Sequence, residues 1–267
     1  MPAESTAVST HELTRRFDSL LAVDAVSLAI AEGDVFGLLG PNGAGKTTTI
    51  KMLTTLLQPT SGTARVAGFD VVREPVAVRR NIGYVPQAVS ADGLLTGREN
   101  LSVFTKLYAI PRSERRKRID DALALMGLGD AASALVKTYS GGMVRRLEIA
   151  QSMLHEPPVL FLDEPTIGLD PVARRVVWEH LRAVRAELGT TILLTTHYME
   201  EATELCDRVA IMHRGKIAAI GATDELVSAS GTSDLDEAFA HYTGADLVEG
   251  GTYRDALRTR RTARRLA

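Results

Sequence analysis

A glycine-rich stretch that directly follows a short apolar run constrains this chain more than any other feature. The apolar run, VFGLL, occupies residues 35–39, and GPNGAGKT follows it at residues 40–47. Continuous apolar character over so few residues predicts a buried strand, and the helical spacing of apolar residues over 45–57 predicts a helix. This order of strand, loop and helix is the setting in which the pattern G-x-x-x-x-G-K-[ST] binds phosphate.

The composition of this loop suits the phosphates of a nucleotide. Its glycines let the backbone wrap closely around phosphate oxygens, and the positive end of the following helix adds to the attraction. We expect Lys46 to reach the β- and γ-phosphates and the Thr47 hydroxyl to coordinate Mg²⁺. A chance glycine-rich turn would not account for the strand before it and the helix after it. The predicted nucleotide-binding residues of the loop are Gly40, Pro41, Asn42, Gly43, Ala44, Gly45, Lys46, Thr47 and Thr48.

A second apolar run ends in two carboxylates. Residues 159–164 read VLFLDE, which predicts a buried strand with Asp163 at its end. There Asp163 can hold the Mg²⁺ shell, and Glu164 can orient or deprotonate an attacking water. The alternative, a strand ending in a solvated acidic turn, is weakened by the phosphate-binding loop. The guanine-reading pattern Asn-Lys-x-Asp is absent from the sequence, which argues against a switch GTPase.

Composition limits the class of protein. The 267 residues have a net charge of −2, which argues against nucleic acid as the main partner. A single cysteine, Cys206, excludes an intrachain disulfide framework and fits a reducing compartment. The first residues lack the apolar segment of a secretory signal, and the longest apolar runs fall far short of the roughly 20 residues that span a bilayer. We therefore expect a soluble chain that acts at a membrane only through another chain.

The apolar runs predict an α/β fold. Each run is short and continuous, and helical patterns separate one run from the next, which predicts strands that are buried on both faces. Strands of this kind form a parallel sheet covered by helices on both sides. The runs lie at residues 35–39, 159–163 and 190–196.

Weaker patterns describe the rest of the chain. We expect short strands over residues 8–30, mostly helix over residues 87–145, and a hairpin that turns at Arg214–Gly215. After Thr223 the pattern is weak, and residues 252–267 carry six arginines. We expect this arginine-rich end to be a disordered tail, with contact to anionic lipid as the alternative.

A second helix start with anion-binding character identifies the family. Residues 139–143 read YSGGM and precede a helical pattern over residues 144–154, with Ser140 as the expected N-cap. Gly141 and Gly142 expose backbone N–H groups at this helix start. One nucleotide does not obviously need two such sites in one chain. Here the sequence resembles the ATP-binding cassette (ABC) ATPases, whose signature is usually Leu-Ser-Gly-Gly-Gln.

The resemblance implies a nucleotide site shared between two chains. In the ABC family two cassettes pack head to tail, and the signature of each closes over the γ-phosphate of the ATP bound by the other. The implied partner is a second ABC ATPase chain, either a copy of this chain or a paralogue. Ser140, Gly141 and Gly142 would then contact the partner's nucleotide.

Four further residues stand where the family has its landmarks. Gln87 resembles the Q-loop glutamine, which contacts Mg²⁺ and the attacking water and responds to the membrane partner. Asp170 resembles the D-loop aspartate, and His197 resembles the switch histidine that holds the γ-phosphate. Phe17 lies where the family has the aromatic that stacks on adenine. The implied catalytic residues are Glu164, His197, Gln87 and Lys46, and the implied Mg²⁺ ligands are Thr47, Gln87 and Asp163.

The signature departs from the family pattern at two positions, with Tyr139 for leucine and Met143 for glutamine. Its Ser-Gly-Gly centre is intact, so we expect activity to be retained. Together with LLTGRENL at residues 94–101 and LDEAFAHYTG at residues 235–244, this form resembles the ATPase subunits of daunorubicin-type drug-resistance exporters.

The resemblance covers about residues 8–222 and implies the fold in more detail. It implies a P-loop NTPase core whose parallel sheet is flanked by helices, an N-terminal antiparallel β subdomain and a helical subdomain that carries the signature. We expect a nucleotide-binding domain over residues 1–222, with the helical subdomain at about 88–145, and a C-terminal appendage over residues 223–267.

The implied function is that of the ATP-hydrolysing, energy-coupling subunit of an exporter for a drug, antibiotic or lipid-like molecule. We expect ATP as the substrate and Mg²⁺ as the cofactor. We expect separate membrane-spanning permease subunits as partners, and the cytoplasmic face of the cell membrane as the location. One alternative is a soluble ABC ATPase of translation or DNA repair, although the second cassette or long coiled-coil insertion usual there is absent. The other is a regulatory protein that binds nucleotide without hydrolysis, which the intact Lys46, Asp163, Glu164 and His197 argue against.

Overall fold

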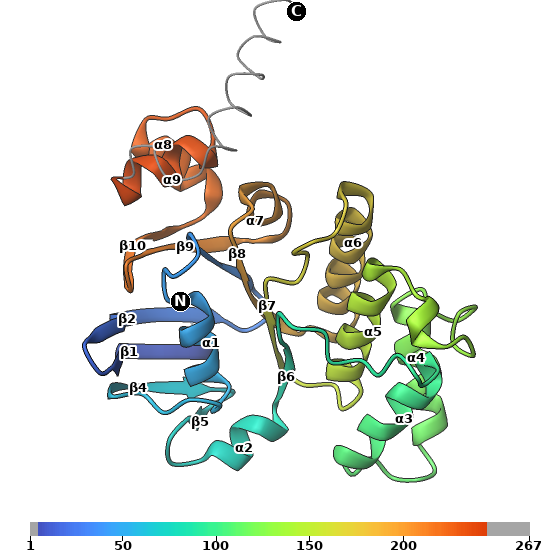
Figure 1. Ribbon diagram of the computed structural model, residues 1–267. Coiled ribbons are helices and arrows are strands. Elements are labelled where there is room, and N and C mark those ends of the chain that lie inside the picture. The colour runs from blue at the N-terminus through green and yellow to red at the C-terminus, as the bar shows by residue number, and fades with distance from the viewer. Residues whose placement is uncertain (1–4, 245–267) are drawn as a thin grey trace, which may run out of the picture.

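The central element of the fold is a six-stranded, mostly parallel sheet. The computed structural model describes residues 5–244. The strands of this sheet are β3 (Val35–Leu39), β6 (Ile82–Val85), β7 (Val159–Asp163), β8 (Thr191–Thr196), β9 (Arg208–His213) and β10 (Lys216–Gly221). Their order is β10-β9-β3-β8-β7-β6, and all neighbours are parallel except the antiparallel pair β9 and β10 (Figure 1). The predicted parallel sheet and the predicted hairpin at Arg214–Gly215 are both confirmed.

Alternation of side chains along these strands produces two separate hydrophobic cores. Successive side chains of a strand point to opposite faces of its sheet. Phe36 and Leu38 of β3 belong to the core on the side of the N-terminal sheet, whereas Val35 and Leu39 belong to the core on the side of the larger helices. None of the four is more than 5 % exposed, which explains why the run is continuously apolar.

The N-terminal part of the chain forms a four-stranded antiparallel sheet, as the family resemblance implies. Its strands are β1 (Thr6–Phe17), β2 (Leu20–Ala31), β4 (Ser61–Val66) and β5 (Phe69–Asp70), in the order β2-β1-β4-β5. The expectation of short strands over residues 8–30 is wrong, because two strands of 12 residues each span this region. The register shifts between Thr10 and Leu13, where Glu12 has φ 48°, and such a bulge interrupts the alternation that would reveal a long strand.

Helix α1 (Lys46–Leu53) lies between the two sheets and contacts β2, β4 and β7 (Figure 1). It begins directly after the phosphate-binding loop, as predicted, but it ends at Leu53 rather than at the expected Leu57. Thr55 adopts φ 64°, in the left-handed region, which is incompatible with a longer α-helix. A short helix, α2 (Pro75–Arg80), packs against β5 and β6.

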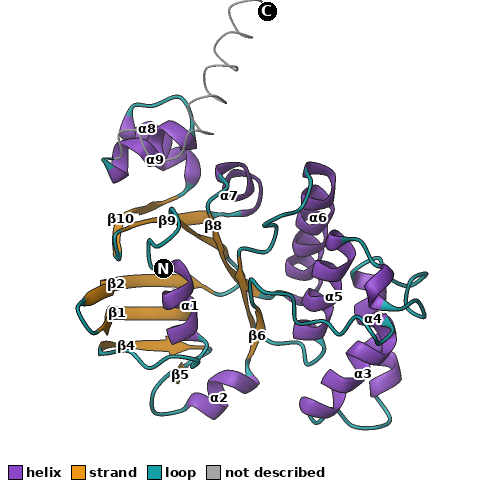
Figure 2. Cartoon of the chain, viewed as in Figure 1, coloured by secondary structure: helices purple, strands orange, loops and turns teal. Residues whose placement is uncertain are grey.

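Most of the helices that follow β6 lie on the other side of the parallel sheet (Figure 2). They are α3 (Gly97–Leu107), α4 (Arg115–Leu125), α5 (Gly141–Met153), α6 (Pro171–Leu188) and α7 (Met199–Leu205), and a 3₁₀ helix spans Val136–Thr138. Residues 87–145, expected to be mostly helical, contain α3, α4 and the start of α5, but these helices cover only about half of the segment, and turns and loops form the rest. Thr96 caps α3 through a reciprocal pair of hydrogen bonds with Glu99, which defines where that helix begins.

Two helices that the sequence pattern did not reveal follow β10. They are α8 (Thr223–Ser230) and α9 (Leu235–Thr243). Their buried side chains, Leu226, Leu235 and Ala238, join the core on the helical side. With so few buried residues each, they leave little periodic signal.

The arginine-rich end at residues 252–267 lies outside the described residues. Within the described part of the chain, none of the helices combines the length and the apolar character needed to cross a bilayer.

Candidate functional site

A cavity of about 620 Å³ opens where the phosphate-binding loop meets the N-terminal sheet. It gathers segments that are far apart in the sequence, from the end of β1, the phosphate-binding loop, and the loops after β6, β7 and β9. Every predicted ATP-binding residue except Gly40 lines it, together with Gln87 and Glu164. The full lining is Phe17, Leu20, Leu21, Ala22, Pro41, Asn42, Gly43, Ala44, Gly45, Lys46, Thr47, Thr48, Gln87, Glu164, Arg214 and Gly215.

Two glycines of the loop are required by its geometry. Gly45 has φ 108°, and a Cβ added there would lie 2.5 Å from the carbonyl oxygen of Ala22. Gly40 passes so close to β9 that an added Cβ would collide with the carbonyl oxygen of Met212. Helix α1 begins directly after Gly45, and residues 46–48 line the cavity. The unpaired N–H groups of the first helical turn are therefore available to an anion at this place.

Lys46 is buried beside the loop and is 5 % exposed. Its ammonium donates hydrogen bonds to the carbonyl oxygens of Gly40 and Pro41, at 2.7 and 3.2 Å. It also pairs with Glu164, since the distance from Lys46 Nζ to Glu164 Oε1 is 3.2 Å. His197 Nδ1 lies 2.7 Å from the other carboxylate oxygen, Glu164 Oε2. A lysine, a carboxylate and a histidine therefore form one connected group beside the loop.

Asp163 joins the end of β7 to the start of α1. Its Oδ1 accepts hydrogen bonds from Thr47 Oγ1 at 3.0 Å and from Thr195 Oγ1 at 2.7 Å. Among the described residues, no cluster of three or more His, Cys, Asp or Glu side chains could hold a metal ion by itself. Mg²⁺ is usually bound by one or two carboxylates together with substrate phosphates rather than by such a cluster. The hydroxyl of Thr47 and the carboxylate of Asp163 fit Mg²⁺ held jointly with a nucleotide.

Thr195 organises both acidic residues, and the sequence analysis did not identify it. Its Oγ1 and its carbonyl oxygen accept the N–H of Glu164, at 3.0 and 3.1 Å. These bonds hold Glu164 at φ 50°, a conformation that costs roughly 1–3 kcal/mol for a residue other than glycine. Asp163 lies opposite Thr195 in the register of β7 and β8. A polar residue near the carboxyl end of an otherwise apolar strand is the signal that could have revealed it.

Gln87 is placed in the cavity by two charged residues of α5 that the sequence analysis also missed. Arg145 donates hydrogen bonds to the carbonyl oxygens of Pro86 and Gln87, at 2.8 and 3.1 Å. Glu148 lies 3.1 Å from Arg145 in a buried ion pair and accepts hydrogen bonds from the N–H and the hydroxyl of Ser90. Such a pair on one helix face is more often solvent-exposed, so the sequence pattern alone did not mark it.

Phe17 is the aromatic residue of the cavity and is 38 % exposed. The Arg15 guanidinium lies over its ring, 4.5 Å from the centroid, and donates a hydrogen bond to the carbonyl oxygen of Gln58 at 2.9 Å. This cation–π contact holds the ring in place. An exposed, held aromatic ring next to a phosphate-binding loop provides a surface on which a planar base can stack.

The signature lies outside this cavity. Ser140 caps α5, as predicted, and its hydroxyl accepts a backbone N–H at 3.3 Å. Ser140 and Gly141 are exposed. Gly141 and Gly142 pack closely against the start of α6, because added Cβ atoms would lie 3.2 Å from the Leu169 side chain and 3.1 Å from Ala173 Cβ. The structure therefore keeps the signature apart from the phosphate-binding loop of its own chain.

The fold accommodates the large side chain of Tyr139, the first departure from the usual signature. Its hydroxyl donates a hydrogen bond to the carbonyl oxygen of Ala131 at 2.7 Å. A Cβ at Gly97, the first residue of α3, would collide with that hydroxyl. Burial raises the pKa of the Tyr139 hydroxyl above its ordinary value. The tyrosine is thus accommodated on the α3 side, away from the cap at Ser140.

Asp170 has a structural role within the chain and does not line the cavity. Its Oδ1 accepts the N–H groups of Val172 and Ala173, both at 2.9 Å, so it is the N-cap of α6. Pro171 at the first helical position suits this cap.

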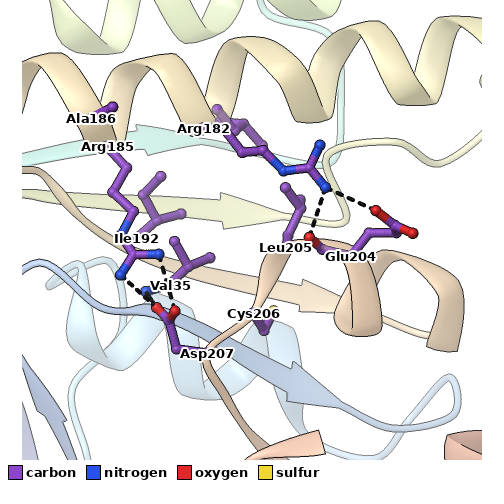
Figure 3. A pocket seen from close by; sticks show the side chains of 10 residues that line it. Val35, Arg182, Arg185, Ala186, Ile192, Glu204, Leu205, Cys206 and Asp207 are labelled. Atoms are coloured by element: carbon purple, nitrogen blue, oxygen red, sulfur yellow. Dashed lines mark hydrogen bonds and ion pairs between the residues drawn. The ribbon is translucent and has the colours of Figure 1, made fainter.

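A second cavity, of about 500 Å³, lies between α6 and the segment after α7 (Figure 3). Its two arginines are both neutralised, because Arg182 pairs with Glu204 at 2.9 Å and Arg185 pairs with Asp207 at 3.0 Å. None of the predicted site residues lines this cavity. The first cavity, which the predicted phosphate-binding residues line, is therefore the candidate nucleotide site.

Comparison with known proteins supports this assignment. The model of the ABC transporter family matches residues 23–167. The daunorubicin/doxorubicin resistance ATP-binding protein DrrA of Streptomyces peucetius is 49 % identical over 229 residues, which cover 86 % of this chain and 69 % of that protein.

Solved structures agree with the family model. The ATP-binding subunit of an ABC transporter is similar with a TM-score of 0.78 and 30 % identity, over 89 % of this chain and 99 % of that one. A dimeric ATP-binding cassette in a post-hydrolysis state with bound ADP and phosphate is similar with a TM-score of 0.71 and 27 % identity, over 80 % and 98 % of the two chains. The phosphate-binding loop, the paired carboxylates and these relatives together place the chain in the ABC transporter family, among its ATP-binding proteins.

Proposed function

We propose that this chain is the ATP-hydrolysing subunit of a membrane exporter. The observation that carries the proposal is the connected group of Lys46, Glu164 and His197 beside the phosphate-binding loop. A protein that only bound nucleotide would not need a carboxylate that is both strained in its backbone and linked to a histidine.

In the proposed binding mode, adenine stacks on Phe17 and the phosphates lie along the loop. Lys46 reaches the β- and γ-phosphates from its buried position, and the N–H groups of the loop and the first turn of α1 surround them. Thr47, Asp163 and Gln87 are the residues that would hold Mg²⁺. When bound there, Mg²⁺ neutralises charge on the phosphate oxygens.

Glu164 is the proposed general base. Its carboxylate lies at the cavity, where it can accept a proton from a water that attacks the γ-phosphorus. His197 Nδ1 lies 2.7 Å from Glu164 Oε2, and we assign it the role of orienting this carboxylate and of contacting the γ-phosphate. Lys46 offsets the negative charge of the phosphates as the bond to the leaving group breaks.

The proposed hydrolysis site is completed by a second cassette. Ser140 and Gly141 are exposed and separate from their own chain's cavity, so they are free to face the nucleotide of a partner. The similar dimeric cassette with ADP and phosphate supports such an assembly. The partner is either a second copy of this chain or a paralogous cassette.

The proposed cargo is a drug, antibiotic or lipid-like molecule, moved by separate membrane-spanning permease subunits. The support is the 49 % identity to a daunorubicin/doxorubicin resistance ATP-binding protein. Val89 and Leu94, 67 % and 77 % exposed, lie in the loop that follows Gln87 and offer apolar surface to a permease. The proposed location is thus the cytoplasmic face of the membrane.

The proposed domain boundaries are those that the resemblance to the ABC family implies. We assign residues 1–222 to the nucleotide-binding domain, about 88–145 to its helical subdomain, and residues 223–267 to a C-terminal appendage. Within the described part of that appendage, α8 and α9 contact β9 and β10 of the parallel sheet.

Two measurements test the proposed function. The purified full chain is incubated with MgATP and phosphate release is measured, and the chain is then affinity-purified from its native membranes to identify co-purifying proteins. Phosphate release together with a co-purifying polytopic membrane protein supports an exporter subunit. Phosphate release with only soluble partners would favour a translation or repair ATPase, and bound but unhydrolysed ATP would favour a regulatory protein.

The Phe17→Ala substitution is expected to raise the Michaelis constant for ATP about 5- to 150-fold, which corresponds to the roughly 1–3 kcal/mol that one stacked base contributes. Turnover at saturating ATP should fall much less, because Phe17 lies at the base and not at the reacting phosphate. Steady-state phosphate release over a range of ATP concentrations measures both. The matched control is Phe17→Tyr, which retains an aromatic face. Equal Michaelis constants for the alanine variant and wild type would contradict the stacking role.

A further inference from the structure

The segment that carries His197 and the turn that carries Asp170 are joined by a buried carboxyl group. This group belongs to Glu201, on α7, which begins two residues after His197 and is buried in the folded chain. The hydrolysis proposed above makes no use of it. Glu201 faces α6 and the turn after β7, two segments from other parts of the sequence.

Glu201 receives two hydrogen bonds at a single oxygen. Thr166 Oγ1 donates to Glu201 Oε1 at 2.8 Å, and Trp178 Nε1 donates to the same oxygen at 2.9 Å. Thr166 lies in the turn between Glu164 and Asp170, and Trp178 lies on α6. One carboxyl group therefore connects the turn after β7, the middle of α6 and the start of α7.

A carboxyl group in this position needs an explanation beyond packing. Burial raises the pKa of Glu201, and the two hydrogen bonds from Trp178 and Thr166, the nearby hydroxyl of Thr196 and the charge of Arg174 oppose that rise only in part. Burying a polar group costs free energy unless its partners are well placed, and an apolar side chain would fill the space at lower cost. A buried carboxyl at such a junction is expected where one defined arrangement of the surrounding segments is needed.

A second set of contacts joins the segment that carries His197 to the turn that carries Asp170. Arg174 lies one helical turn before Trp178 on α6, so both side chains occupy the same face of that helix. Arg174 Nε donates a hydrogen bond to the carbonyl oxygen of Leu169 at 3.1 Å, and its guanidinium lies 4.1 Å from the centroid of the Tyr198 ring. Leu169 precedes Asp170 and Tyr198 follows His197, and the rings of Tyr198 and His197 are 4.2 Å apart.

We propose that Glu201 is a positioning residue that couples the His197 segment to the turn bearing Asp170, with Thr166, Trp178 and Arg174 as its links. A nucleotide that engages His197 then also sets the turn that leads from Glu164 to the N-cap of α6. Glu201 does not line the cavity, and its effect on turnover passes through the two segments that it joins. The inference rests on the proposed hydrolysis at Glu164.

The chain contains its own reporter for this coupling. Trp178 is the only tryptophan in the sequence, and its indole N–H donates directly to Glu201. The fluorescence of an indole changes when its hydrogen-bond partner moves. Binding of MgATP at the cavity is therefore expected to change Trp178 emission in the wild-type chain.

The experiment measures phosphate release and the MgATP-induced change in Trp178 emission in four variants of the full chain. Glu201→Leu removes the carboxyl, and Glu201→Gln keeps an acceptor of the same size. Thr166→Val removes one donor and nearly keeps the shape. Glu200→Gln makes the same chemical change on an exposed neighbour and serves as the matched control.

For Glu201→Leu we expect turnover to fall about tenfold, the nucleotide-induced emission change to disappear and the Michaelis constant to stay within about threefold of wild type. Glu201→Gln should restore both readouts, and Glu200→Gln should match wild type. Wild-type turnover and a wild-type emission change in Glu201→Leu would overturn the proposal. If Glu201→Leu loses its near-ultraviolet circular dichroism and does not fold, Thr166→Val tests the proposal instead. Its turnover and its MgATP-induced change in Trp178 emission are then compared with those of wild type.

The two proposals fail in distinguishable ways. Absence of phosphate release from the wild-type chain would reject the proposed hydrolysis. The coupling would then be tested by the MgATP-induced change in Trp178 emission alone, in wild type and in Glu201→Leu. Normal wild-type turnover, with a Glu201→Leu chain that turns over and responds to MgATP like wild type, would reject the coupling alone.

Discussion

The Lys46→Ala chain is expected to lose at least about a hundredfold of its phosphate release, because Lys46 is the buried cation beside the phosphate-binding loop. Its affinity for ATP should fall about 10- to 150-fold, since a charge-assisted hydrogen bond contributes roughly 1.5–3 kcal/mol. Removal of the ammonium also leaves the buried carboxylate of Glu164 without its cation. A lower melting temperature is expected for that reason.

The matched control for this prediction is Lys51→Ala. Lys51 lies in the last turn of the same helix, α1, but its side chain is exposed and does not line the cavity. The same loss of charge should therefore leave turnover unchanged there. Phosphate release is measured at several ATP concentrations and circular dichroism follows unfolding. A folded Lys46→Ala chain with wild-type turnover would contradict the assignment of the loop.

The Glu164→Gln chain is expected to bind MgATP and to hydrolyse it about 100- to 10,000-fold more slowly, the range that a general base contributes. An amide keeps the size and the ability to hold a water, but it is a far weaker proton acceptor. Thr47, Asp163 and Lys46 are unchanged, so the contacts to phosphate and Mg²⁺ should persist. Loss of a negative charge also lowers the repulsion against the γ-phosphate.

Because the nucleotide is not consumed, this variant should accumulate as an ATP-bound dimer. Size-exclusion chromatography with light scattering, with and without MgATP, measures the dimer, and phosphate release is followed in parallel. The control is Glu187→Gln, which removes an exposed carboxylate on α6 and should behave as wild type. Near-normal turnover in Glu164→Gln, or the loss of ATP binding, would reject the role of Glu164.

The elements that carry the nucleotide could be predicted because their signals are local. The run at Val35–Leu39 is apolar on both faces of one strand, and the loop after it has its own pattern. The N-cap at Ser140 could also be predicted, because the signal consists only of neighbouring residues: a serine followed by two glycines and a helical pattern. The short strands expected for β1 and β2 were wrong because bulges interrupt their alternation.

The supporting contacts of the site could not be predicted, because they depend on how distant segments meet. Thr195 reaches Asp163 and Glu164 only through the register between β7 and β8. Arg145 reaches the carbonyl oxygen of Gln87 across 58 residues of sequence, once α5 packs beside the end of β6. The sequence predicts which groups take part in the chemistry, and the tertiary structure shows what holds each of them.

The most direct test of a site shared between two chains is to mix two inactive variants. Lys46→Ala disables the phosphate-binding loop and leaves the signature intact. Ser140→Arg leaves the loop intact and places a bulky cation where the partner's γ-phosphate would lie. Head-to-tail pairing of the two variants restores one complete site, formed by the loop of the Ser140→Arg chain and the signature of the Lys46→Ala chain.

Phosphate release is measured for each variant alone and for mixtures at a constant total concentration of chain. We expect each variant alone to be inactive, and the mixtures to regain activity with a maximum near equal amounts of the two. Failure of every mixture to release more phosphate than the separate variants, although the Ser140→Arg chain still binds ATP, would contradict a nucleotide site built from two chains.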